Sequence, residues 1–187
     1  MHHFGNLLFV LQGHVLQADP RDATAPLAAI AGNVDRGAVA LRVWRHLLGD
    51  GGPEPGHAGR TLREVAELAR VGVREAGHRL DADGCEAAEL VVDLAAFVPA
   101  VVAALRACLA AVPPGVPTLA VVRWRKEDDV LAIDVQPEPG SLPFPFPAGA
   151  VLAGWSDRAR AGQWPYAASQ TARGLQLAIR MANFSRS

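Results

Sequence analysis

The sequence predicts an α+β fold, a mixed sheet with two helices packed on one of its faces. Apolar residues recur at helical spacing over Leu62–Ala76 and again over Val98–Leu109. A β-hairpin, Leu119–Trp124 and Val130–Val135, follows the second helix. Because each apolar stripe needs a surface to cover it, we expect both stripes to form the core between helices and sheet.

Composition is that of an ordinary globular protein. The chain has 187 residues, half of them hydrophobic and a fifth charged, which suits one domain. A net charge of −1 makes nucleic acid an unlikely partner. Cys85 and Cys108 lack disulfide or metal-ligand spacing and are read as buried thiols. Nothing resembles a signal peptide or a membrane span, so we expect a cytoplasmic protein without a membrane partner.

The first third of the chain is expected to supply strands. Leu7–Val10 is a short apolar run between glycines, which is typical of a buried strand. Ala38–Trp44 alternates apolar and other residues and favours a second strand. Gly49–Gly59 is rich in glycine and proline and is interpreted as a loop.

The predicted elements of the middle region have recognisable ends. Thr61 and Glu64 have the spacing of a capping box at the start of the first helix, and Gly77 is placed to end it. Ala87–Val92 is expected to be a strand that ends at Asp93.

After residue 136 the composition changes, which suggests a body over 1–136 and an extension over 137–187. The segment Pro137–Pro147 alternates proline with phenylalanine and is expected to be extended chain. Thr171–Met181 is a candidate closing helix. Because exposed aromatic rings are unfavourable in water, we expect the extension to wrap over the body and bury Trp155 and Trp164.

The order helix, strand, helix, hairpin resembles the RidA/YjgF family. The similar motifs are Ala76-Gly77, Leu80-Asp81 and the Asp93-Leu94-Ala95-Ala96-Phe97 run at the head of the second helix, with Gly5–Val10 similar to the family's first strand. The resemblance implies a homotrimer with small metabolites bound in clefts between subunits, and hydrolysis or isomerisation of an imine or enamine. Val116 stands where the family has its carboxylate-binding arginine, so enzymatic activity is left open.

The same resemblance implies the candidate site residues. His14 and Asp134 are the acid–base candidates, His14 because of its pKa range and Asp134 because it keeps an acidic position of the last strand. Arg123, Gly13 and Thr118 are the candidate substrate contacts. A surface histidine and a strand carboxylate facing solvent are the structural alternatives for His14 and Asp134.

Other function classes remain open at this stage. No residue spacing indicates a metal site, and no motif indicates a cofactor. A non-catalytic interaction or assembly protein that docks through its Pro/aromatic extension is the main alternative. RNA binding has only the Arg123–Lys126 stretch in its favour.

Overall fold

The computed structural model describes residues 2–17, 24–82, 89–110, 112, 115–125, 130–137, 166–171, 174–180 and 184. It divides into two compact units, Met1–Arg45 and His46–Ser187. The first is a helical unit and the second an α/β unit, and each is described by itself.

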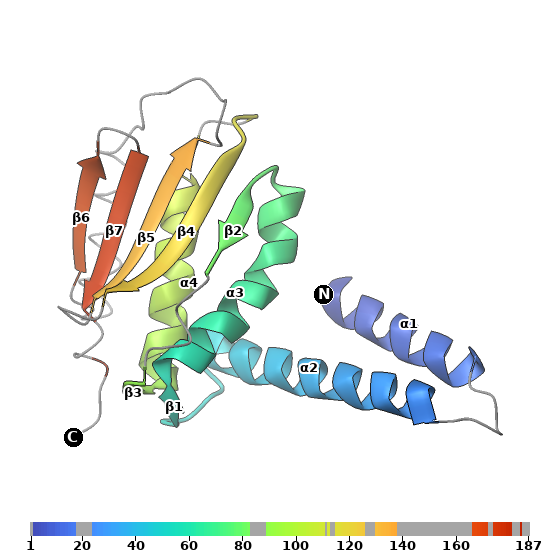
Figure 1. The fold of residues 1–187 in the computed structure, drawn as a ribbon. Coiled ribbons are helices and arrows are strands. Elements are labelled where there is room, and N and C mark those ends of the chain that lie inside the picture. The colour runs from blue at the N-terminus through green and yellow to red at the C-terminus, as the bar shows by residue number, and fades with distance from the viewer. Residues whose placement is uncertain are drawn as a thin grey trace. The chain divides into compact units, whose positions relative to one another are not determined.

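The helical unit contains α1 (His2–Gln17) and α2 (Thr24–Leu48) as far as Arg45, and Figure 1 draws both helices in blue. The strands predicted over Leu7–Val10 and Ala38–Trp44 are therefore wrong. Apolar runs this short are compatible with either type of element, and both lie inside longer segments in which apolar residues recur at helical spacing. Among the described helices, none has the length and apolarity needed to cross a membrane.

The α/β unit contains a five-stranded mixed sheet, in which β2 pairs parallel with β4 and the other pairs are antiparallel. The strand order is β2-β4-β5-β7-β6, as Figure 1 shows. The strands are β2 (Arg79–Asp81), β4 (Thr118–Arg125), β5 (Val130–Pro137), β6 (Tyr166–Thr171) and β7 (Gly174–Arg180). The predicted hairpin is confirmed as β4 and β5, which pair from Thr118↔Pro137 to Arg125↔Val130.

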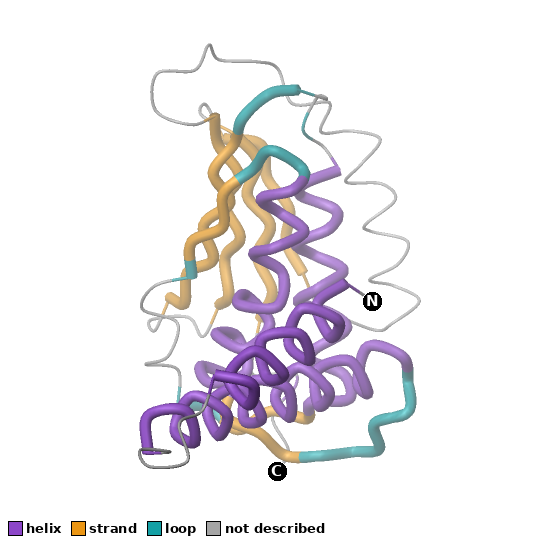
Figure 2. The backbone as a smooth tube through the Cα atoms, turned by 90° about the vertical axis from the view of Figure 1, so that its right-hand side faces the viewer, coloured by secondary structure: helices purple, strands orange, loops and turns teal. Residues whose placement is uncertain are grey.

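Two helices, α3 (Ala58–Glu75) and α4 (Leu94–Ala110), cover one face of this sheet (Figure 2). This confirms the predicted α+β class, the mixed sheet and the two helices on one face. The core between the layers consists of fully buried apolar side chains, the largest of which are Phe97, Leu62, Leu94, Leu131 and Ile133.

The end of α3 is as predicted and its start is not. Gly77 has φ +82°, its N–H donates to Arg74 O, and the His78 N–H donates to Val73 O, which is the Schellman arrangement that favours glycine. The helix begins at Ala58 rather than after Thr61. Thr61 lies inside the first turn and donates its hydroxyl to His57 O, so it does not form a capping box with Glu64.

The start of α4 is fixed by a side-chain cap. The backbone N–H of Ala95 donates to Asp93 Oδ1 at 3.2 Å, which satisfies one of the free donors of the first turn. The helix therefore begins earlier than the predicted Val98 and carries Pro99 in its interior. Of the strand predicted over Ala87–Val92, residues 87 and 88 lie outside the described residues and residues 89 and 90 are not in a strand, so that the strand found here is β3 (Val91–Asp93).

Part of the segment after residue 137 belongs to the sheet. β7 pairs with β5 and β6 pairs with β7, so the helix predicted over Thr171–Met181 is wrong. Phe184 is buried and meets Phe97 with ring centroids 5.6 Å apart in an edge-to-face arrangement. Residues 138–147, Trp155 and Trp164 lie outside the described residues, so burial of the two tryptophans stays a prediction.

Candidate interaction surface

The residues predicted to form a site lie in two different units. Gly13 and His14 are inside α1 of the helical unit, where a loop after a strand was expected. Asp134, Arg123 and Thr118 belong to the β4–β5 hairpin of the α/β unit. The acid–base role predicted for His14 together with Asp134 therefore stays a prediction.

The hairpin residues themselves lie on opposite faces of the sheet. Asp134 is paired with Val121 and Arg123 with Ala132, and this register sets both charged residues on the face opposite to Ile133. Asp134 is half-buried and Arg123 is exposed. Thr118 points to the other side, is fully buried, and its hydroxyl lies 2.9 Å from His78 Nδ1. The geometry gives Thr118 a structural hydrogen bond.

The thiol of Cys108 is an unreactive group. Burial, and after it the negative charge of Asp134, raises the pKa of Cys108 from 9.0 to about 12. A thiol is nucleophilic only as its thiolate, so at neutral pH this side chain behaves as a small hydrophobic residue. The reading of Cys108 as a buried thiol is confirmed.

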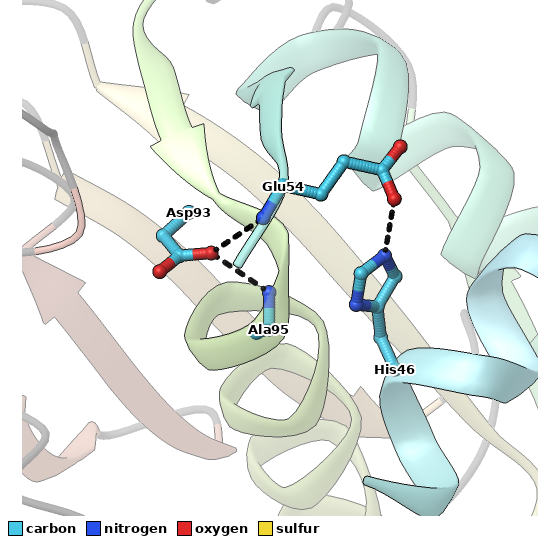
Figure 3. A network of polar contacts seen from close by, with 4 residues as sticks. All are labelled: His46, Glu54, Asp93 and Ala95. Atoms are coloured by element: carbon cyan, nitrogen blue, oxygen red, sulfur yellow. Dashed lines mark hydrogen bonds and ion pairs between the residues drawn. The ribbon is translucent and has the colours of Figure 1, made fainter. Parts of the chain in front are cut away.

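A polar network joins the loop after α2 to the start of α4 (Figure 3). Glu54 Oε2 lies 3.2 Å from Nε2 of the buried His46. The Glu54 backbone N–H donates to Asp93 Oδ1, and the Leu94 N–H donates to Glu54 O. Beside it, β1 (Pro55–His57) pairs with β3 in a separate two-stranded sheet. Since the network ties a loop to a helix start, we interpret it as structural.

Gly51 fixes the shape of this loop. A Cβ at that position would lie 2.3 Å from His46 Nδ1 and 2.7 Å from Cε1, far inside contact distance. Only glycine lets the loop backbone approach the imidazole so closely. Among the described residues, His46 Nδ1 is buried without a hydrogen-bond partner. The imidazole is thus packed closely against the loop at Gly51.

The helical unit exposes most of the large apolar side chains found on the described surface. On α1, Phe9 and Leu16 are each 77% exposed, and Val10 and Val15 are exposed as well. On α2 the exposed members are Leu27, Val34, Leu41, Trp44 and, at the end of the helix, Leu48. In the α/β unit beyond the end of α2, only Val91 of the described residues is in this class. Large contiguous apolar patches on a surface mark interaction sites.

The large exposed residues of α2 lie along one stripe of the helix, which also contains the half-buried Ile30 and Gly37. Leu27, Val34 and Leu41 are seven residues apart, and Ile30, Gly37 and Trp44 each follow three residues after one of them. This is the heptad spacing of a helix that packs against another helix. We call these six residues the α2 seam. Asn33 and Ala40, which adjoin Gly37 and Trp44 on the helix at i±3 and i±4 spacing, are buried, and so is Val43.

Sequence reasoning missed this surface because Ala38–Trp44 was interpreted as a strand. The seven-residue spacing of Leu27, Val34, Leu41 and Leu48 is visible in the sequence and is the signal that could have found it. Alternation at Val39, Leu41 and Val43 covers too few residues to outweigh that longer period.

No known protein-family model matches the chain, and no curated protein matches it. Solved structures do match. A bacterial phosphotransferase has 18% identity and a TM-score of 0.46, with 95% of this chain and 89% of that chain covered. The cytoplasmic segment of histidine kinase QseC has 10% identity and a TM-score of 0.45, covering 68% and 76%. Histidine kinase AdeS of Acinetobacter baumannii has 11% identity and a TM-score of 0.39, covering 96% and 98%.

The resemblance to RidA/YjgF is therefore corrected. The compared structures are a phosphotransferase and histidine kinases, and Gly5–Val10, matched to the first RidA strand, is helical. The imine or enamine hydrolase activity and the trimer that it implied are withdrawn with it. The compared structures have TM-scores below 0.5 and identities below 25%, so they assign no function to this chain.

Proposed function

We propose that this chain is an assembly protein, a homodimer held together by its helical unit, which joins two α/β units. The observation that carries the proposal is the exposure of Leu27, Val34, Leu41 and Trp44 in the α2 seam, together with that of the apolar side chains of α1. A helix that is apolar on more than one side needs neighbours on more than one side. A unit of two helices cannot supply them, whereas two copies supply the four helices of a bundle.

The exposed area is of the right size for a stable interface. Eight exposed apolar side chains of the helical unit, at roughly 100 Å² each, offer about 800 Å², which is about the area that each partner contributes to a standard protein interface. These residues are Phe9, Val10, Val15, Leu16, Leu27, Val34, Leu41 and Trp44.

A second copy of the chain fits this surface better than a charged partner does. The seam itself contains no charged residue. Both signs of charge occur next to it on α2, where Asp35 and Arg45 are exposed. A second copy related by a two-fold axis can therefore offer a basic residue for each acidic one. Across a two-fold axis the same apolar surface of each copy meets its counterpart.

The first test is the mass of the full chain in solution. Multi-angle light scattering at micromolar concentration is expected to give twice the monomer mass of 19.7 kDa. A mass of one chain over the whole concentration range would contradict the proposal. A mass of three chains would also contradict it, because the proposed axis is two-fold.

A second candidate function is phosphoryl transfer through a histidine of α1. Three of the six histidines of the chain, His2, His3 and His14, lie in this one helix. Imidazole nitrogen is a nucleophile that forms covalent intermediates. Phosphoryl transfer is the activity in the names of the phosphotransferase and the histidine kinases above. For this chain, only the histidines of α1 suggest that activity.

Phosphorylation by phosphoramidate tests the second candidate. The P–N bond of the donor breaks, ammonia leaves, and a new P–N bond forms at an imidazole nitrogen that loses its proton. Mass spectrometry is expected to find an acid-labile phosphoryl group on one α1 histidine, and that group should disappear when the residue is changed to Gln. His57→Gln, at an exposed histidine of the α/β unit, is the control. Absence of phosphate from all three would exclude this candidate.

A further inference from the structure

Gly37 lies in the middle of α2, where glycine is unfavourable. Glycine in a helix interior costs about 1 kcal/mol relative to alanine because it loses the most backbone freedom. The helix continues for eleven residues beyond it. A glycine at this place therefore needs a reason in the packing.

Within the single chain, the residues that the structure describes provide no such reason. A Cβ built at Gly37 meets nothing within 4 Å, whereas at Gly51 and Gly56 a Cβ would collide with a side chain of the same chain. Gly72 in α3 is equally open. Gly37 differs from Gly72 in its setting, because it lies in the α2 seam between the exposed residues Val34 and Leu41.

We infer that α2 of a second copy crosses this helix at Gly37, backbone against backbone. The inference rests on the proposed homodimer and specifies its closest point. Helices approach most closely where the contact residue has no side chain, and the neighbouring large residues then pack around the crossing. In a two-fold interface, a residue at the crossing point meets its own copy. Gly37 thus faces Gly37 of the second copy, with Val34 and Leu41 beside it.

The test is a disulfide across the two-fold axis. A disulfide forms only when the two Cα atoms come within about 7 Å, so Gly37→Cys is expected to give a covalent dimer on a non-reducing gel under mild oxidation. Gly32→Cys is the matched control, because Gly32 is in the same helix, outside the seam, and a Cβ there meets only Arg36 Nη1 at 3.8 Å. The unsubstituted chain gives the background from Cys85 and the buried Cys108.

A second variant tests the crossing at Gly37 without oxidation. Gly37→Leu inserts a side chain at the crossing and is expected to raise the dimer dissociation constant at least tenfold, while Gly32→Leu leaves it within twofold. Sedimentation equilibrium measures both. Dimers that neither cross-link at position 37 nor weaken with Gly37→Leu would overturn the crossing and leave the homodimer standing. A chain that is monomeric without any substitution would overturn both.

Discussion

The full chain carrying Val34→Asp and Leu41→Asp is expected to be a monomer with an intact α/β unit. Both side chains are more than half exposed in the single chain, so the substitutions remove no core contact within it. In the dimer they would set four carboxylates into an apolar interface. An unpaired charge in such surroundings costs several kcal/mol, which exceeds what the lost apolar contacts alone would cost.

Light scattering and thermal unfolding decide this prediction together. The variant should show the mass of one chain at a concentration where the unsubstituted chain shows two. Ala25→Asp with Ala28→Asp is the matched control, because it adds the same charge to exposed positions of α2 outside the seam. A double seam variant with unchanged dimer mass would show that the helical unit associates through another surface.

Replacing Phe97 by alanine is expected to lower the free energy of unfolding of the α/β unit by about 3–5 kcal/mol. Phe97 is fully buried in α4, and its ring meets that of Phe184 edge to face. The substitution leaves a cavity and also removes the aromatic pair, which alone contributes about 0.5–1.5 kcal/mol.

Urea unfolding followed by circular dichroism measures the loss. Phe97→Leu keeps most of the volume and should cost clearly less, and Val91→Ala, at an exposed residue of β3, should cost little. Equal stabilities for Phe97→Ala and the original chain would mean that Phe184 does not pack on α4 and that Phe97 is not part of the core.

The candidate surface could have been predicted only in part. The heptad spacing of Leu27, Val34 and Leu41 is a property of the sequence, but a seven-residue spacing does not tell whether the chain itself covers those residues. The exposure of these three side chains shows that the described part of the chain does not cover them, and this exposure is known only from the folded structure. The local structure around Gly13 and His14 was missed for a different reason: these residues were placed by analogy with a strand, and the segment is helical.

The sequence by itself determined the elements whose signals are long or chemically specific. The apolar stripes of α3 and α4 extend over several turns, Gly77 supplies the positive φ at which α3 ends, and the charged residues of the sequence between Leu119–Trp124 and Val130–Val135 separate two strand-like apolar runs. Tertiary structure alone decided the short segment Gly174–Arg180, which became a strand because β5 offers it an edge on which to pair. Leu7–Val10 and Ala38–Trp44 instead follow the helical period of the longer segments that contain them. A short run fits either period, so its surroundings, which the local sequence does not contain, select between helix and strand.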